Sequence, residues 1–209
     1  MMARMTVGIV IFSEVEVLDF AGPFEVFSVT RLDDARRREE PSPFDVLLVA
    51  ADRQAVTTVG GMNVLPHVSF EDCPPLDILV VPGGWGTRTQ MLNGRMLAFV
   101  TAQARSVRWL TAVCTGALIL GKAGLLNDKQ ATTHWRSLEL MQNLFPEVRV
   151  ERTSHVVVDG GIVTSSGIAA GIDMALTVVA RCCGEEVARA TARHMEYPYP
   201  DSLDRRVEL

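Results

Sequence analysis

The stretch Trp109-Leu-Thr-Ala-Val-Cys114-Thr-Gly-Ala-Leu-Ile-Leu-Gly121 decides the fold of this chain. An apolar run with β-branched residues stops at a cysteine, and small residues begin a helical pattern directly after it. The neighbours two positions away, Ala112 and Gly116, are small, as a tight turn from strand to helix requires. The pattern predicts a nucleophile elbow, in which Cys114 faces the crevice at the strand ends where open α/β folds bind ligands.

The surroundings of Cys114 allow two interpretations. In an elbow, the sulfur lies at a helix N-terminus, where unpaired N–H groups and the helix dipole favour the thiolate. In the alternative, Cys114 is buried between a strand and a helix and acts as a small apolar side chain. We favour the elbow and therefore expect a reactive thiolate at this position.

Outward from this turn, apolar strand-like runs alternate with helix-like runs, which is typical of a parallel sheet covered by helices on both faces. We therefore expect an α/β fold with a mostly parallel central sheet. Central strands are expected over residues 6–12, 44–50, 77–81 and 107–113, and two further strands over 148–154 and 155–164. Helices are expected over residues 17–32, 91–105, 115–123, 139–144, 171–183 and 185–194.

Glycine and proline set two local expectations. Gly22 and Pro23 fall within the first predicted helix, and we assign them to its first turn, where proline is tolerated. Gly60 and Gly61 separate two short β-rich runs. Residues 56–68 are therefore predicted to form a small hairpin on a glycine turn.

The length of 209 residues predicts a single domain over residues 1–209, with a core from about residue 6 to 195 and a C-terminal tail over 196–209. The tail has the composition of a segment wrapped on the surface or of a contact arm. The net charge of −5 argues against nucleic acid as a partner. No segment approaches the roughly 20 apolar residues of a membrane span, and residues 1–10 lack the sections of a secretion signal. We therefore expect a cytoplasmic protein without membrane contact.

The cysteine spacing argues against a metal site. None of the four cysteines forms a Cys-x-x-Cys pair, and no histidine pair has zinc spacing. A disulfide framework is not expected in a reducing compartment. We therefore expect no metal, no cofactor and no disulfides.

The segment Val-Val-Pro-Gly83-Gly84-Trp-Gly follows the predicted strand 77–81. Glycines at a strand end let backbone N–H groups turn inward without a side chain in the way. Together with the N–H of Thr115, such groups are typical donors to a developing negative charge. The alternative is an ordinary loop turn, which the glycines alone do not distinguish.

Two further residues are candidates for proton transfer or substrate contact. Asp19 follows the first predicted strand, at the sheet edge where the elbow is expected, and a carboxyl group there suits a proton donor or acceptor. Its alternative role is that of a helix N-cap. His134, after the short run 130–133, suits a base or a substrate contact, with a structural histidine as the alternative.

Four motifs in this order resemble the ThiJ/PfpI family of the class I glutamine amidotransferase-like superfamily. They are Val-Val-Pro-Gly-Gly at 80–84, Ala-Val-Cys-Thr-Gly at 112–116, Ala-Thr-Thr-His-Trp at 131–135 and Ser-Ser-Gly-Ile-Ala-Ala-Gly-Ile-Asp-Met-Ala-Leu at 165–176. The resemblance implies a flavodoxin-like three-layer sandwich, a homodimer and a small-molecule substrate. It also implies that Cys114 is the nucleophile and that Asp19 hydrogen-bonds it. Gly167 and Ile168 of the last motif join His134 as candidate substrate contacts.

The closest branch by resemblance holds isonitrile hydratases and the amidase-like sensor domains of AraC-type regulators. Protease-like members have Cys-His-Gly at the elbow, whereas this chain has Cys-Thr-Gly with Thr115, so a peptidase is disfavoured. AraC-type regulators carry a helix-turn-helix module after this domain. The chain as given leaves no room for one after residue 195, so we expect no direct DNA binding.

These features support three functions. The first is hydration of an isonitrile to an N-substituted formamide, a lyase reaction in which the Cys114 thiolate attacks and Asp19 manages the proton. The second is hydrolysis of small amides or thioesters by the same cysteine. The resemblance implies this activity, because the family is often described as one of intracellular proteases and amidases. The third is a non-enzymatic domain in which Cys114 senses a ligand or an oxidant.

Overall fold

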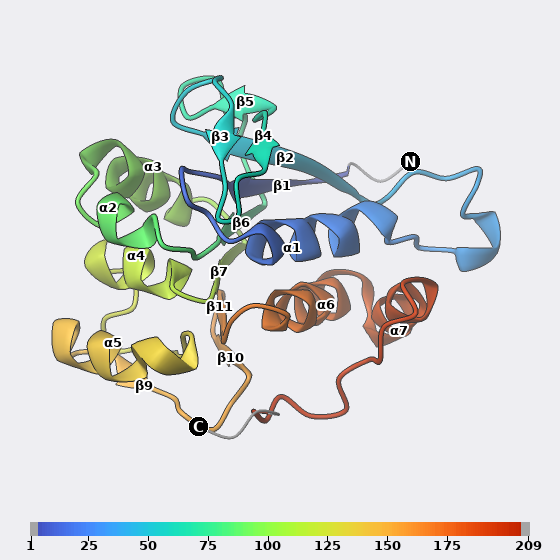
Figure 1. Cartoon of the computed structure of the whole chain (residues 1–209). Coiled ribbons are helices and arrows are strands. Elements are labelled where there is room, and N and C mark those ends of the chain that lie inside the picture. Colours follow the sequence, from blue (N-terminus) through green and yellow to red (C-terminus); the bar gives the residue numbers. More distant parts are fainter. Residues whose placement is uncertain (1–3, 206–209) are drawn as a thin grey trace.

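The computed structural model describes residues 4–205, which form a central sheet between two layers of helices (Figure 1). The order of strands in the sheet is β10-β11-β7-β6-β1-β2-β5, and only the β10–β11 pair is antiparallel among these neighbours. The strands are β1 (Met5–Val10), β2 (Phe44–Ala50), β5 (Val68–Ser69), β6 (Ile78–Val81), β7 (Trp109–Val113), β10 (Val156–Asp159) and β11 (Ile162–Ser165). The predicted mostly parallel sheet is confirmed.

The helices divide between the two faces of the sheet. One face packs against α1 (Val17–Val29) and α6 (Ala170–Cys183), and α7 (Glu185–His194) packs on these two helices. The other face packs against α2 (Thr87–Gln90), α3 (Gly94–Ala104) and α4 (Gly116–Lys122). In Figure 1 these two groups lie on opposite sides of the strands, with α5 (Leu138–Leu144) below α4. Because both faces are covered, central strands such as β6 are fully buried. Their sequences are therefore continuous apolar runs.

The first helix differs from its prediction around Pro23. Helix α1 begins at Val17 and continues through Pro23 to Val29, so the proline lies in the interior and not in the first turn. Proline has no N–H, and the helical hydrogen bond to the carbonyl of Asp19 is therefore absent. Pro23, Val26 and Phe27 are all buried in the core. This packing offsets the lost hydrogen bond, so the helix continues through the proline.

The predicted helix over 91–105 forms as α3 and begins three residues later than expected, and a separate short helix, α2, precedes the predicted range. Helix α2 ends before Met91, and α3 begins at Gly94. The break lies at Asn93, whose side-chain oxygen accepts hydrogen bonds from the backbone N–H groups of Arg95, at 3.0 Å, and Met96. An asparagine with this geometry is an N-cap, and it starts a new helix.

The predicted hairpin is shorter than expected. Strands β3 (Val56–Thr57) and β4 (Asn63–Val64) pair antiparallel around Gly60 and Gly61, which have φ angles of 85° and 88°. Val68 belongs instead to β5, which extends the main sheet beside β2. The predicted strand over 148–154 is also shorter, because only β9 (Arg149–Val150) forms, in a separate pair with β8 (Gln130–Ala131).

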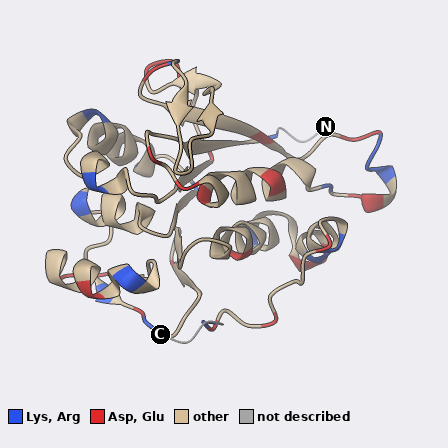
Figure 2. Ribbon diagram, in the orientation of Figure 1, with Lys and Arg blue, Asp and Glu red and all other residues tan. Residues whose placement is uncertain are grey.

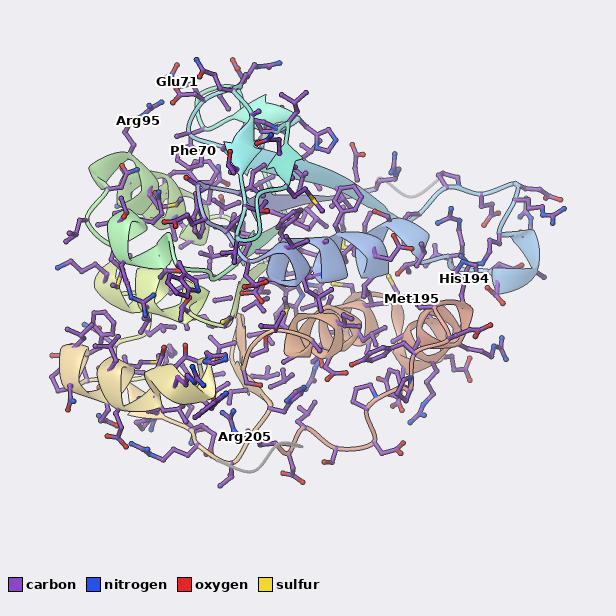
Figure 3. All side chains as sticks on the ribbon, in the orientation of Figure 1. Phe70, Glu71, Arg95, His194, Met195 and Arg205 are labelled. Atoms are coloured by element: carbon purple, nitrogen blue, oxygen red, sulfur yellow. The ribbon has the colours of Figure 1, made fainter. Side chains whose placement is uncertain are left out.

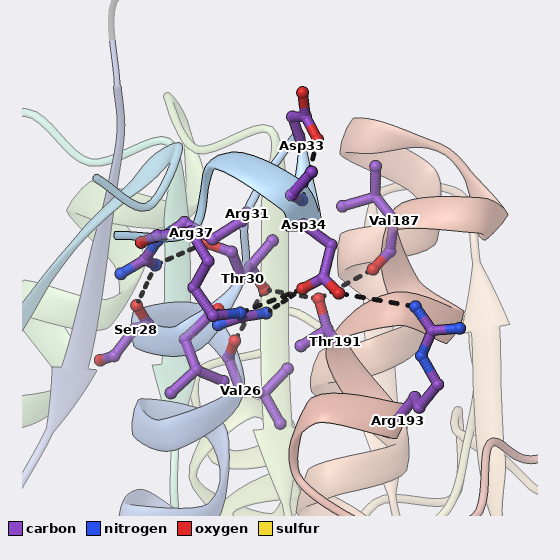
Figure 4. A network of polar contacts seen from close by, with 12 residues as sticks. Val26, Ser28, Thr30, Arg31, Asp33, Asp34, Arg37, Val187, Thr191 and Arg193 are labelled. Atoms are coloured by element: carbon purple, nitrogen blue, oxygen red, sulfur yellow. Dashed lines mark hydrogen bonds and ion pairs between the residues drawn. The ribbon is translucent and has the colours of Figure 1, made fainter. Parts of the chain in front are cut away.

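Side-chain contacts connect the turn after α1 to α7. Asp34, in the 3₁₀ turn η1 (Asp34–Arg36), accepts hydrogen bonds from Arg37 at 2.8 and 3.0 Å and pairs with Arg193 of α7 at 3.5 Å (Figure 4). The hydroxyl of Thr191 lies 3.3 Å from that of Thr30. These contacts fix α7 against the end of α1.

The described part of the predicted tail lies along the sheet edge at β10. Leu203 accepts the backbone N–H of His155 at 2.6 Å. Arg205, labelled at the lower edge of Figure 3, donates to the carbonyl of Arg152 at 2.8 Å and to the hydroxyl of Thr132 at 3.2 Å. The tail therefore follows the surface up to residue 205, and the last four residues of the predicted tail lie outside the described residues.

Candidate functional site

Cys114 lies at the turn between β7 and α4 with a φ angle of 57°, in the left-handed region that side chains rarely adopt. Its N–H donates to the carbonyls of Ser165 at 3.1 Å and Ser166 at 3.2 Å, and its carbonyl accepts from the Thr133 hydroxyl at 2.7 Å. A side chain at Gly116 would place its Cβ 2.0 Å from the carbonyl oxygen of Val81. A glycine two positions after the cysteine is therefore required for this tight turn.

The carboxyl of Asp19 is fully buried beside the Cys114 thiol. Its Oδ2 accepts the backbone N–H of Gly83 at 2.9 Å, and its Oδ1 has no hydrogen-bond partner among the residues that the structure describes. The thiol lies near enough that a hydrogen bond from it lowers the pKa of Asp19. Asp19 does not cap α1, because the N-cap position is Glu16. The carboxyl instead connects β6 to the elbow.

Burial controls protonation at this pair. It raises the pKa of Asp19 from 3.8 to about 8, against the lowering effect of the hydrogen bond from Gly83. Burial and the charge of Asp19 also raise the pKa of the Cys114 thiol well above 9, and the backbone N–H of Thr115 opposes this. The prediction of a favoured thiolate is therefore wrong for the free protein: the helix N-terminus acts as expected, but burial outweighs it. At neutral pH the pair is a thiol beside a carboxylic acid.

The N–H groups of the Pro-Gly-Gly segment are already occupied. That of Gly83 is donated to Asp19, and that of Gly84 is donated to the Thr115 hydroxyl at 3.1 Å. The same hydroxyl contacts the Gly84 carbonyl at 3.2 Å and the Thr87 hydroxyl at 2.9 Å. The two glycines thus hold Asp19 and Thr115 in place, and both the backbone N–H and the hydroxyl of Thr115 interact with the sulfur.

Gly167 lies beside both the Cys114 sulfur and the ring of His134. A Cβ atom at Gly167 would lie 2.7 Å from Cys114 Sγ and 2.6 Å from His134 Cδ2. Burial and the nearby charges of Arg136 and Arg205 lower the pKa of His134 from 6.5, so its ring is neutral at pH 7. Its Nδ1 accepts the N–H of Arg136 at 3.3 Å, and the proton of the neutral ring is therefore on Nε2.

A cavity of about 540 Å³ opens over the thiol. Of the predicted site residues, Gly84, Cys114, Thr115, His134 and Ile168 line it; Asp19 and Gly83 lie behind Cys114 and Thr115, and Gly167 lies beside Cys114 and His134. Its other lining residues come from α2, from the 3₁₀ turn η2 (Trp135–Ser137) and from the loops beside them: Glu16, Trp85, Arg88, Arg136 and Ser137. Sequence reasoning missed these five residues.

The missed residues carried a weak sequence signal. Trp85 directly follows Gly84, and Arg136 and Ser137 directly follow the segment Ala-Thr-Thr-His-Trp, so both motifs extend by one or two residues into the cavity. Arg88 and Glu16 have no motif of their own.

No group of three or more His, Cys, Asp or Glu side chains within residues 4–205 is arranged to hold a metal ion. Cys73, Cys182 and Cys183 are half-buried free cysteines away from the cavity. Over the same described range, no helix has the length and apolar character to cross a membrane.

Comparison with known proteins identifies the family of this chain. The model of the DJ-1/PfpI family matches residues 5–181. Isonitrile hydratase of Pseudomonas putida is 38% identical over 193 residues, which cover 92% of this chain and 78% of the hydratase. The HTH-type transcriptional regulator GbdR of Pseudomonas aeruginosa is 34% identical over 149 residues, but the chain spans only 40% of that regulator.

Solved structures give the same fold. A ThiJ/PfpI family protein from Pseudomonas syringae superimposes with a TM-score of 0.81 at 28% identity, covering 96% of this chain and 78% of that one. Drosophila melanogaster DJ-1beta superimposes with a TM-score of 0.77 at 19% identity, covering 94% of this chain and all of that one, and therefore supports the flavodoxin-like fold alone. Since the family model spans most of the chain and the hydratase aligns with nearly all of it, this chain belongs to the DJ-1/PfpI family.

Proposed function

We propose that this protein hydrates isonitriles to N-substituted formamides. The observation that carries the proposal is the buried pair of Cys114 and Asp19, with the sulfur at the wall of a cavity and the carboxyl protonated at neutral pH. The reaction needs a nucleophile for the terminal carbon and an acid that protonates this carbon, and the pair supplies both. The 38% identity to an isonitrile hydratase supports the same reaction.

In the first step, sulfur and a proton add to the terminal carbon of the isonitrile. Asp19 gives its proton to that carbon while the Cys114 sulfur bonds to it, and Asp19 takes the thiol proton in return. The product is a thioimidate, R–N=CH–S, on Cys114. Because the same carboxyl gives one proton and takes another, no separate base is needed.

In the second step, water adds to the thioimidate carbon. Asp19 gives its proton to the nitrogen and takes one from the water, which leaves R–NH–CH(OH)–S on Cys114. When the C–S bond breaks, the hydroxyl proton returns to sulfur through Asp19. The formamide R–NH–CHO leaves, and the thiol and the carboxylic acid are restored.

Three neighbours assist this sequence. The backbone N–H of Thr115, which interacts with the sulfur, stabilises negative charge there while the C–S bond forms or breaks. Gly83 holds Asp19, and the Gly84 N–H holds the Thr115 hydroxyl. His134, neutral with Nε2–H as its donor, orients the substrate beside Gly167 and Ile168.

The test is turnover of cyclohexyl isonitrile and an aryl isonitrile by the purified protein, followed by NMR detection of the formamide proton. We expect formamide from the wild type and a loss of at least a hundredfold in Asp19→Asn, since the amide has no acidic proton to give. Glu25→Gln, on the exposed side of the same helix, serves as the matched control. Absence of formamide with both substrates would refute the proposal.

Hydrolysis of small amides or thioesters is the second candidate. The Thr115 N–H beside the sulfur favours it, because one donor for an oxyanion is present. The Pro-Gly-Gly segment supplies no second backbone donor in the free protein, since the N–H groups of Gly83 and Gly84 are occupied. A panel of small amides and thioesters, assayed beside the isonitriles with Cys114→Ser as control, separates the two activities.

A further inference from the structure

Two arginines from separate elements line the cavity over Cys114. Arg88 belongs to α2 and Arg136 to η2, and both side chains are exposed to solvent. Figure 2 shows basic positions, in blue, on α2 and near α5. Glu16 is the one acidic residue among the lining residues. The lining therefore has a net positive charge, whereas the whole chain has a net charge of −5.

Neither arginine has an ion-pair partner within residues 4–205. Some exposed arginines elsewhere do: Arg95 pairs with Asp52 at 3.2 Å, and Arg152 with Glu139 at 2.6 Å, whereas Arg181 is exposed and, within the same range, unpaired like the two arginines of the cavity. The guanidinium of Arg136 lies 4.8 Å from the ring centre of Trp135, a cation–π contact that orients the group and leaves its N–H edge unoccupied. Two unpaired guanidinium groups beside a nucleophile suit an anionic ligand.

We propose that the natural substrate carries a carboxylate or a similar anionic group, which Arg88 and Arg136 bind while the reacting carbon lies at Cys114. This inference rests on the proposed hydration for the identity of the reacting group, an isonitrile. Planar guanidinium groups bind carboxylates through paired N–H donors. The indole of Trp85 and the side chain of Ile168 provide apolar surface for the body of the substrate between its two ends.

Charge within the cavity sets the orientation of the substrate. The backbone N–H of Glu16 donates to the carbonyl of Gly83 at 3.0 Å, which places this cavity-lining acid next to the segment that holds Asp19, and its charge raises the pKa of Asp19. His134 adds no positive charge, because its pKa is lowered. An anionic end is therefore repelled from Glu16 and attracted to the two arginines, which leaves the neutral isonitrile end at the sulfur.

The test compares 4-isocyanobenzoate with its methyl ester, which has the same reacting group and no charge. For the wild type we expect kcat/KM to be about tenfold higher for the carboxylate, the value of one charge-assisted hydrogen bond. In Arg88→Gln and in Arg136→Gln this preference falls to roughly one- to threefold, mainly through KM, and 0.5 M salt reduces it in the wild type. The matched control is Arg181→Gln, at the far end of α6, which keeps the preference.

A second readout does not depend on isonitrile turnover. Iodoacetate and iodoacetamide differ in charge but little in size, and peptide mass spectrometry after alkylation at pH 9 reports their rates at Cys114. We expect the rate ratio of iodoacetate to iodoacetamide to exceed that of free N-acetylcysteine and to fall in both arginine variants. If no isonitrile is hydrated but this ratio behaves as expected, the hydration fails and the anion site stands.

Two results would overturn the anion site. One is an ester hydrated as fast as the carboxylate. The other is an alkylation ratio equal to that of N-acetylcysteine and unchanged in Arg88→Gln and Arg136→Gln.

Discussion

The Asp19 carboxyl and the Cys114 thiol lie side by side in a buried site: burial raises the pKa of both groups, and Asp19 raises that of Cys114 further, whereas the hydrogen bond from Cys114 lowers that of Asp19. The carboxyl comes from the first turn of α1, the thiol from the turn after β7, and the hydrogen bond from Gly83 of the β6–α2 loop fixes the carboxyl between them. Three strand-to-helix connections of the sheet thus meet at this pair of groups. The predictions below follow from this arrangement.

The pH profile of turnover should follow the ionisation of Asp19. Its pKa is about 8, and the proposed first step uses its protonated form. We expect kcat/KM for a neutral isonitrile to be level from pH 6 to 7 and to fall tenfold per pH unit well above pH 8. An increase in kcat/KM up to pH 9 would mean that the thiolate, and not the acid, limits the reaction.

Replacement of Asp19 by asparagine should stabilise the fold. The folded pKa of about 8 lies above the ordinary 3.8, so between these values the unfolded chain releases a proton that the folded protein retains. Stability is therefore lost as pH rises from about 4 to 8. The free energy of unfolding of Asp19→Asn should exceed that of the wild type by roughly 3–5 kcal/mol at pH 8 and by little at pH 4.

The measurement is urea unfolding at both pH values, with Glu25→Gln as the control. Glu25 is exposed on the same helix, and its replacement should give the same small difference at pH 4 and pH 8. An Asp19→Asn difference that stays constant over this range would show that the carboxyl has an ordinary pKa in the folded protein.

The reactivity of Cys114 should be low at neutral pH. Burial raises the pKa of its thiol well above 9, and the charge of Asp19 adds to this effect. We expect alkylation by iodoacetamide to be slower at pH 7 than that of N-acetylcysteine, and to accelerate up to pH 10. In Asp19→Asn the midpoint of this increase should move to lower pH, because the neighbouring negative charge is gone.

Peptide mapping of the alkylated protein assigns each rate to its cysteine. Cys73 and Cys183, with pKa values raised to about 11 by burial, provide internal references that do not contact Asp19. Their rates should be the same in Asp19→Asn and in the wild type. A thiol of Cys114 that is fully reactive at pH 7 would contradict the described environment.

Substitution of Gly167 should reduce turnover while the protein still folds. The added methyl of Gly167→Ala would meet Cys114 Sγ at 2.7 Å and His134 Cδ2 at 2.6 Å, and both are side-chain atoms that can move. Their displacement should lower kcat by about ten- to a hundredfold, since catalysis depends on the position of the reacting atoms. Gly94→Ala is the matched control, because a Cβ there meets nothing within 4 Å.

The two glycine variants are compared by circular dichroism and by steady-state kinetics. Gly94→Ala should keep full turnover. Equal turnover by Gly167→Ala would show that the cavity wall tolerates displacement and that Gly167 does not position the sulfur.

Much of the fold was predictable because its determinants are local. Strand β2 and helix α7 have the predicted bounds, since each is a periodic run with clear ends. The interior position of Pro23 was not predictable, because burial of α1 against the sheet offsets the missing hydrogen bond. The shift of Val68 from the hairpin to β5 likewise depends on pairing with β2, which is distant in sequence.

The candidate site divides in the same way. The turn at Cys114 follows from nearby residues, since Gly116 alone permits the approach to Val81. The protonation state of the Cys114 thiol does not follow from nearby residues, because it depends on burial of the thiol by the whole fold. The arginines of the cavity have no local signature, since only the fold brings Arg88 of α2 and Arg136 of η2 to the lining of one cavity. The homodimer and the cytoplasmic location stay predictions.

The central claim is that the Cys114 thiol forms the bond to the isonitrile carbon. Its most direct test is the rate of formamide production by Cys114→Ala beside the wild type, at equal concentration and with the fold verified by circular dichroism. We predict formamide from the wild type and a loss of at least a thousandfold in the variant, because no other group in the cavity can form the thioimidate. Formamide production by Cys114→Ala at the wild-type rate would contradict the account.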